Sequence, residues 1–212
     1  MTTHGPEQLV AAARAVGVRD ARLLEAIAAV PRRDFVPPEL AGRAYADEPL
    51  PIAHAQVTTQ PSLVAQMVEA LALAGGERVL EIGTGYGWQT ALLARLAAEV
   101  WSVERFADLA AEGRARLDRH GVASVRVVVG DGTEGLSAHA PYDAILVSAA
   151  FPEVPAPLVE QLTPSGRLVQ PIGPGGAENV TLFVRAEEGL RLVRVITGAH
   201  FVPLVGRLGF AP

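Results

Sequence analysis

The chain has 212 residues, of which half are hydrophobic, and its formal net charge is −5. This length is typical of one domain with a sizeable core, and the acidic balance argues against a nucleic-acid-binding surface. The absence of cysteine excludes disulfides, thiolate nucleophiles and cysteine-based metal sites. With neither a signal-peptide pattern nor an apolar run that could span a bilayer, we expect a cytoplasmic protein that does not bind membranes.

The N-terminal part of the chain predicts two short helices and a long loop. Apolar residues at helical spacing between Pro6 and Val16 predict the first helix, and Asp20 is a suitable N-cap for a second helix that Pro31 ends. Residues 31–58 hold five prolines and few periodic apolar residues. Loops of this length inside a compact domain are usually functional or disordered, and the aromatic residues here favour an ordered loop packed on the core.

The run Thr59-Gln60-Pro61 predicts the start of the next helix, whose apolar positions continue to Leu71. Either Thr59 or Gln60 would be its N-cap. On the simplest interpretation, Thr59 only caps the helix. A compatible interpretation is that the threonine hydroxyl and free N–H groups at the helix start form a small anion site, for which a substrate carboxylate is one candidate.

The central motif of the chain runs from Val79 to Trp88. An apolar strand enters the turn Gly83-Thr84-Gly85-Tyr86-Gly87, and an Ala- and Leu-rich helix follows. Glycines let a ligand approach the backbone, and the helix start presents its N–H groups to that ligand. We therefore expect a nucleotide-like cofactor here, although a glycine turn in an ordinary α/β domain would show the same pattern.

The spacing of the glycines in this turn narrows the choice of cofactor. Its third glycine comes one residue earlier than in the dinucleotide fingerprint, and position 88 is tryptophan. A phosphate-binding P-loop is excluded because the chain contains no lysine. The turn, preceded by Leu-Glu-Ile, resembles the cofactor loop of S-adenosylmethionine-dependent methyltransferases.

After the glycine turn, strands and helices alternate. We expect strands at residues 100–103, 125–129, 142–147 and 167–172, helices at 106–119 and 157–162, an antiparallel pair at 180–185 and 190–196, and an edge strand at 201–205. This order predicts an α/β fold with a mostly parallel twisted sheet, helices on both faces and an antiparallel C-terminal hairpin. We expect a single domain over residues 1–212, with a substrate-side part at 1–60 and a cofactor-binding core at 61–212.

Carboxylates lie in or directly after three of these strands, at the edge of the sheet where ligands bind in such folds. Glu104 ends the second strand, about 20 residues past the glycine turn, which favours a role in binding ribose hydroxyls. Asp131 could accept from an adenine amino group, or only bond its own turn. Glu81, under the glycine turn, would lie near the sulfonium or amino group, or only support the turn.

Taken together, several stretches resemble the protein-L-isoaspartate (D-aspartate) O-methyltransferase family over most of the chain. Their order and spacing are those of the family. The matching stretches are Ala44 to Asp47, Pro49 to Ile52, Thr59 to Pro61 with Val64-Ala65, Arg78 to Gly85, Ser102 to Arg105, Gly130 to Gly132, Ala140 to Ile145 and Phe201 to Leu204.

The resemblance implies an enzyme that methylates the α-carboxylate of L-isoaspartyl residues in damaged proteins, with S-adenosyl-L-methionine as cofactor and no metal. It implies Thr59 as the active-site residue, where the family usually has serine. The cofactor-binding residues would be Gln56, Val57, Thr58, Glu81, Gly83, Thr84, Gly85, Gly87, Glu104, Asp131 and Gly132. The partners would be isoaspartyl-containing proteins or peptides, and we expect a monomer.

The chain departs from the family pattern at Val57-Thr58-Thr59, where the family commonly reads Thr-Ile-Ser, and at Tyr86 and Trp88 in the glycine turn. These departures leave an alternative substrate open, namely an aspartate in a dedicated peptide or a small acid. A protein that binds the cofactor without catalysis is a third hypothesis, against which the Thr59 hydroxyl and the three glycines argue. A nicotinamide oxidoreductase is the weakest, because position 88 is not glycine.

Overall fold

The computed structural model describes residues 5–211, and its centre is a seven-stranded sheet in the order β5-β4-β3-β6-β7-β8-β9. Strands β5 to β7 in this order are parallel, and β8 and β9 continue the sheet antiparallel. The predicted fold is therefore confirmed. The strands are β3 (Arg78–Ile82), β4 (Glu99–Glu104), β5 (Val125–Val129), β6 (Tyr142–Val147), β7 (Leu162–Ile172), β8 (Glu178–Ala186) and β9 (Gly189–Ala199).

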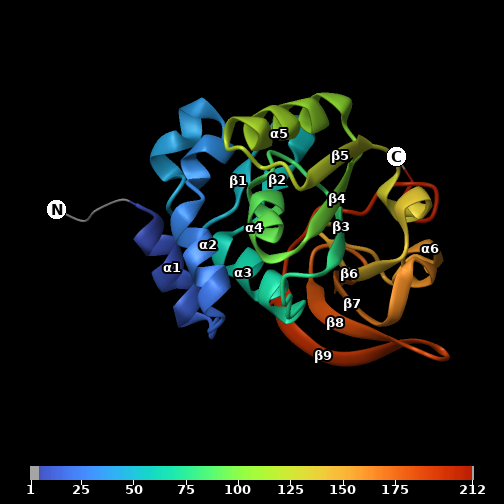
Figure 1. Ribbon diagram of the computed structural model, residues 1–212. Coiled ribbons are helices and arrows are strands. Elements are labelled where there is room, and N and C mark those ends of the chain that lie inside the picture. Colours follow the sequence, from blue (N-terminus) through green and yellow to red (C-terminus); the bar gives the residue numbers. More distant parts are fainter. Residues whose placement is uncertain (1–4, 212) are drawn as a thin grey trace.

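Helices cover both faces of this sheet. In Figure 1, the helices α1 to α4 lie on one side of the sheet and α6 lies on the other. Alternation along the central strands explains this, because Val79 and Ala144 pack in the helical core of α1 to α5 while Leu80 and Ile145 pack with α6. The helices are α1 (Pro6–Ala15), α2 (Ala21–Ala29), α3 (Pro61–Ala70), α4 (Trp88–Leu96), α5 (Ala107–Arg119) and α6 (Ala156–Glu160).

The two predicted helix caps have different outcomes. Asp20 caps α2 as expected, because its side chain accepts the N–H groups of Arg22 and Leu23. The N-cap of α3 is Gln60, whose side chain makes no capping hydrogen bond. Of the two N-cap residues expected for α3, the position of Gln60 is therefore confirmed and Thr59 as a helix cap is wrong. Instead, Asp47 Oδ1 accepts the N–H of Ser62 at 2.8 Å, so a carboxylate from the preceding loop already occupies this helix start.

The expected edge strand at residues 201–205 is also wrong. This segment crosses the carboxyl ends of the strands instead of extending the sheet, and it makes only isolated bridges, from Pro203 to Ala150 and from Val205 to Phe210. Pro203 cannot donate to a ladder, and the N–H of Leu204 bonds the carbonyl of Ala150 at 2.7 Å. The segment thereby becomes a wall above the sheet edge.

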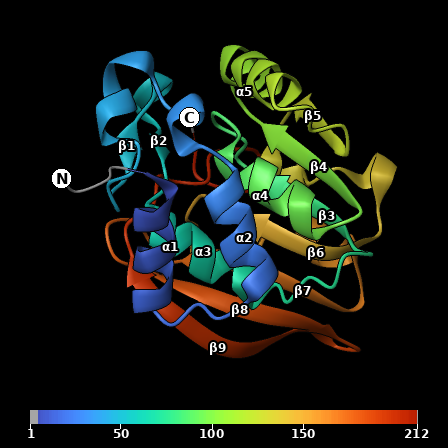
Figure 2. The same cartoon turned by 60° about the vertical axis from the view of Figure 1, so that its left-hand side comes forward.

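The long loop before α3 is ordered around one buried cation. The guanidinium of Arg32 donates to the carbonyls of Ala44, Ala46, Glu48 and Thr59 and to the hydroxyl of Thr58, at 2.9–3.2 Å. Burial lowers the pKa of Arg32 to about 10, so the group stays charged at neutral pH. These bonds join the loop to the two-stranded ribbon of β1 (Leu50–Pro51) and β2 (Val57–Thr58), which lies at the upper left of Figure 2.

A buried carboxylate supports the glycine turn from below. Glu81 in β3 is fully buried and accepts from the hydroxyls of Thr90 and Ser102 at 2.6 Å and from Gln89 Nε2 at 2.8 Å. Ser102 also bonds Thr84 of the glycine turn, at 2.5 Å. Burial raises the pKa of Glu81 to about 7, although these three hydrogen bonds act in the opposite direction.

This shifted carboxyl predicts a pH dependence of stability. Because the folded pKa of Glu81 lies above its unfolded value, its contribution to the free energy of unfolding is complete below pH 4.5 and is lost as the pH rises to 7. A shift of this size corresponds to about 3 kcal/mol. Glu81→Gln should flatten the change between pH 4.5 and 7, measured by chemical denaturation at several pH values.

Glu99→Gln is the matched control for this measurement. In the wild type, the hydrogen bond from Arg78 lowers the pKa of Glu99. The contribution of Glu99 to the free energy of unfolding is therefore lost only as the pH falls below 4.5. Between pH 4.5 and 7 this variant should keep the wild-type slope. An unchanged slope in Glu81→Gln would show that Glu81 ionises normally in the folded protein.

Candidate active site

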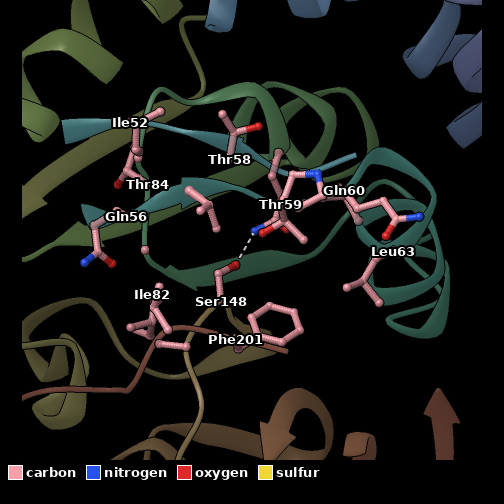
Figure 3. A pocket seen from close by; sticks show the side chains of 18 of the residues that line it. Ile52, Gln56, Thr58, Thr59, Gln60, Leu63, Ile82, Thr84, Ser148 and Phe201 are labelled. Carbon is pink, nitrogen blue, oxygen red and sulfur yellow. Dashed lines mark hydrogen bonds between the residues drawn. The ribbon is translucent and has the colours of Figure 1, made fainter. Parts of the chain in front are cut away.

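A cavity of about 500 Å³ lies above the carboxyl ends of β3, β4 and β6. Its walls come from four parts of the chain: the ribbon and the loop before α3, the glycine turn, the strand ends, and the crossing C-terminal segment. Figure 3 shows residues from all four parts around one space. The lining includes Ile52, Gln56, Val57, Thr58, Thr59, Gly83, Thr84, Gly85, Gly87, Glu104, Gly132, Ser148 and Phe201.

Within the glycine turn, left-handed backbone is required at Gly85 and Gly87, with φ of 52° and 90°. A side chain at Gly85 would also meet Ile52, and one at Gly87 would meet Leu117, both at 3.3–3.4 Å. Only glycine adopts these conformations without strain. The turn thus exposes its backbone to the cavity and leads directly into α4, as the sequence predicted.

Glu104 reaches the cavity from the end of β4. Only 6% of this residue is exposed, and its two carboxylate oxygens accept the N–H groups of Gly85 at 2.9 Å and Phe106 at 3.1 Å. Each carboxylate oxygen accepts about two hydrogen bonds, so both keep capacity for a further donor. A pair of adjacent hydroxyls, as on a ribose, fits this acceptor.

Asp131 and Gly132 are adjacent in sequence but differ in position. Gly132 lines the cavity, whereas Asp131 lines a separate shallow depression beside Arg207. The carboxylate of Asp131 accepts the N–H and hydroxyl of Thr133 and the N–H of Arg207. Burial alone would raise the pKa of Asp131, but these bonds outweigh it and hold the pKa below its ordinary value. The adenine contact expected for Asp131 stays a prediction, since its carboxylate lines the neighbouring depression rather than the cavity.

The four residues from Gln56 to Thr59 all line the cavity, but their polar groups are used differently. The Gln56 amide donates to the carbonyl of His54, and the Thr58 hydroxyl accepts from Arg32. Within residues 5–211, the Thr59 hydroxyl makes no hydrogen bond, so it is available to a ligand. Glu81 does not line the cavity, because Gln89 lies between its carboxylate and the space above.

His54 connects the ribbon to the start of α5. This residue stacks on Phe106 with the ring centres 4.1 Å apart, and its Nε2 lies 2.7 Å from the Asp108 carboxylate at the start of α5. The hydrogen bond from His54 lowers the pKa of Asp108. His54 and Ala55 have φ of 59° and 54°, which is unusual for residues other than glycine. The histidine is therefore structural rather than a ligand of the cavity.

The two aromatic departures in the glycine turn have different environments. Trp88 packs in the core and donates to the carbonyl of Val30 at 3.3 Å, and only 4% of it is exposed where it contributes to the cavity wall. Tyr86 lines the cavity, with the guanidinium carbon of Arg116 4.3 Å from its ring centre. Sequence reasoning missed Ser148 and Gln89, whose only sequence signal was their position next to a strand end and a helix start.

The chemistry available here is that of positioned hydroxyls, carboxylates and backbone groups. Within the described residues no three side chains form a possible metal site. In the same part of the chain, none of the helices has the length and apolarity required to traverse a bilayer. The glycine turn, the shaped space and Glu104 fit an adenosyl cofactor, and the free hydroxyl of Thr59 fits an acceptor substrate beside it.

Comparison with known proteins agrees with this geometry. The family described as protein-L-isoaspartate (D-aspartate) O-methyltransferase matches residues 4–209. The protein-L-isoaspartate O-methyltransferase of Anaeromyxobacter dehalogenans strain 2CP-C is 53% identical over 191 residues, covering 89% of this chain and 91% of the relative. That of Methanoculleus marisnigri is 49% identical over 197 residues, covering 93% and 89%.

A solved structure of a protein-L-isoaspartate O-methyltransferase superposes with a TM-score of 0.81 at 29% identity, covering 96% of this chain and 67% of that one. The match therefore extends from the sequence motifs to the arrangement of the whole sheet. The chain belongs to the protein-L-isoaspartate (D-aspartate) O-methyltransferase family.

Proposed function

We propose that this chain is an S-adenosylmethionine-dependent carboxyl O-methyltransferase that acts on L-isoaspartyl residues of damaged proteins. One observation carries the proposal: a single cavity is lined both by the acceptor carboxylate of Glu104 and by Thr59, whose hydroxyl makes no hydrogen bond within residues 5–211. Family membership over nearly the whole chain supports it. We also propose that the monomer is the active unit.

The cofactor side of the cavity would be formed by the glycine turn and the neighbouring strand ends. Glu104 would accept from the ribose hydroxyls, and the backbone of Gly83, Thr84, Gly85 and Gly87 would lie along the cofactor. Gln56, Val57, Thr58 and Gly132 line the same space and would complete this wall. Asp131 would act through its neighbour Gly132, and Glu81 through Gln89 and Ser102.

The reaction requires little chemistry from side chains. The free carboxylate of an isoaspartyl residue has a pKa near 3.5, like a chain terminus, so it is ionised at neutral pH and requires no base. S-adenosylmethionine supplies a methyl group activated by a positively charged sulfur. The chain therefore has to orient the carboxylate and exclude water, which positioning alone can supply. We propose that the Thr59 hydroxyl holds the carboxylate oxygen in line for transfer.

The start of α3 contributes less to this orientation than its sequence suggests. The carboxylate of Asp47 already accepts the N–H of Ser62, and Pro61 has no N–H to offer. A second anion at this helix end would meet the negative charge of Asp47. The hydroxyl of Thr59, rather than the helix terminus, is thus the main donor on this side of the cavity.

Substrate discrimination tests the proposed function directly. An isoaspartyl peptide should be methylated far better than its aspartyl twin, because only the isopeptide linkage places a free carboxylate on the carbon next to the backbone nitrogen. Radiolabelled methyl transfer to both peptides at equal concentration measures this. Equal reaction, or reaction of the aspartyl peptide alone, would replace the repair function with modification of a dedicated peptide.

Cofactor binding tests the role of Glu104. Glu104→Ala should weaken the affinity for S-adenosylhomocysteine by about 1.5–3 kcal/mol, because charged hydrogen bonds to the ribose are lost. Calorimetry should show one site per chain. Glu99→Gln, on the same strand but outside the cavity, is the control and should bind like the wild type. Equal affinity in Glu104→Ala and wild type would remove Glu104 from the site.

Substitutions of Thr59 distinguish a role in orienting the substrate from a role in stabilising the fold. Thr59→Val keeps the shape and removes the hydroxyl, and it should lower the single-turnover rate at least tenfold, about 1.4 kcal/mol of barrier. Affinity for S-adenosylhomocysteine should change little, because Glu104 and the glycine turn remain. Thr59→Ser should retain most of the activity, since it keeps the hydroxyl.

A second threonine provides the control for Thr59. Thr181 is buried in β8, outside the cavity, and its hydroxyl donates to the carbonyl of Asn179 at 2.9 Å. Thr181→Val should lower the free energy of unfolding by about 1 kcal/mol and leave the rate per folded molecule unchanged. If Thr59→Val behaves in the same way, with full activity per folded molecule, then Thr59 has no catalytic role.

A further inference from the structure

A buried amide connects the carboxylate beneath the glycine turn to the cavity. Gln89, in the first turn of α4, is 9% exposed, and its Nε2 donates to Glu81 Oε1 at 2.8 Å and to Ser148 Oγ at 2.9 Å. Above pH 7, where Glu81 is ionised, its carboxylate only accepts hydrogen bonds, so the nitrogen of the amide faces Glu81. The second N–H of the same nitrogen then points to Ser148. This orientation leaves Gln89 Oε1 without a partner among the described residues.

The hydroxyl proton of Ser148 is consequently free. Ser148 follows β6, and its N–H bonds the carbonyl of Ile82 at 2.9 Å, which fixes its backbone beside Gly83. Its oxygen accepts from Gln89, so its one proton must be donated elsewhere. Ser148 lines the cavity, and Figure 3 shows it between Ile82 and Phe201, with Thr59 across the space.

We propose that Ser148 binds the carboxylate of the isoaspartyl substrate, and that Gln89 is the positioning residue that keeps the Ser148 hydroxyl directed into the cavity. This inference rests on the proposed function and names a second substrate contact beside Thr59. The two hydroxyls come from opposite walls, one from the end of a sheet strand and one from the loop before α3. Together they would hold both oxygens of one carboxylate.

The order of the strands assigns Ser148 to the substrate rather than to the cofactor. Glu104 lies on β4 and Gly132 follows β5, on one side of β3, whereas Ser148 follows β6 on the other side. The ribose and base of the cofactor would therefore extend away from Ser148. On the β6 side the cavity is closed by Phe201 and its neighbours in the crossing C-terminal segment, which leaves this space for the substrate.

The chemistry of transfer predicts which kinetic constant depends on Ser148. As the bond from the carboxylate oxygen to the methyl carbon forms, the carbon–sulfur bond breaks and its electron pair goes to sulfur, so the carboxylate loses its charge. A hydrogen bond to that charge is strongest before transfer. Its removal should therefore raise the KM for the peptide without lowering kcat. In contrast, loss of Thr59, which aligns the attacking oxygen, should lower kcat.

The test compares wild type, Ser148→Ala, Gln89→Leu and the double variant at pH 8, above the pKa of Glu81. Calorimetry measures the binding of an isoaspartyl peptide to protein saturated with S-adenosylhomocysteine, and steady-state assays give KM and kcat. Ser148→Ala should weaken peptide binding and raise KM about tenfold, with kcat and cofactor affinity within twofold of wild type. Ser137→Ala, at an exposed serine outside the cavity, is the matched control.

Gln89→Leu should weaken peptide binding by a smaller factor, and adding it to Ser148→Ala should cause no further loss, because Gln89 acts through Ser148. Independent losses that multiply would overturn the positioning role. Unchanged peptide binding in Ser148→Ala, or a loss of cofactor affinity alone, would overturn the substrate contact while the proposed function stands. A wild type that neither binds nor methylates the isoaspartyl peptide would overturn the proposed function itself, and this inference with it.

Discussion

The active site depends on one buried carboxylate, that of Glu81 in the central strand. It accepts three side-chain hydrogen bonds, from Thr90, Ser102 and Gln89, and these partners connect it to the glycine turn, to β4 and to the cavity. Placing an acid there is unfavourable, as its raised pKa shows, and a neutral residue would pack more easily. The carboxylate instead fixes the orientation of the side chains around it, because each donor must point its hydrogen at one of the two carboxylate oxygens.

The two sides of the cavity are built on different principles. The cofactor side consists of strand ends and a glycine turn, whose positions follow from the ladder of the parallel sheet. The substrate side consists of loop segments that no pairing with the seven-stranded sheet holds in place. These segments are held by a buried cation instead, because the guanidinium of Arg32 donates hydrogen bonds to four carbonyls and one hydroxyl. A planar group with five donors suits this task, which a lysine could not perform in the same geometry.

Most of the sheet could be predicted because its information is local. Apolar runs, glycine turns and residues after strand ends identified β3 to β6 and placed Glu104 correctly. The errors arose where partners are distant in sequence. Asp47 replaces Thr59 at the start of α3 from 15 positions upstream, and Gln89 reaches Ser148 across 59 residues. The segment after β9 has the composition of a strand, but Pro203 and the carbonyl of Ala150 direct it across the sheet instead.

The environment of Arg32 has a consequence for how the protein opens. A fully buried guanidinium that bonds carbonyls from two loop segments is costly to release one bond at a time, because its charge would lose partners while it is still buried. The substrate wall should therefore not detach in sub-global fluctuations, and its amides around Ala46 and Thr59 should exchange with solvent only at the free energy of global unfolding. An enzyme organised in this way retains its recognition surface for as long as it remains folded.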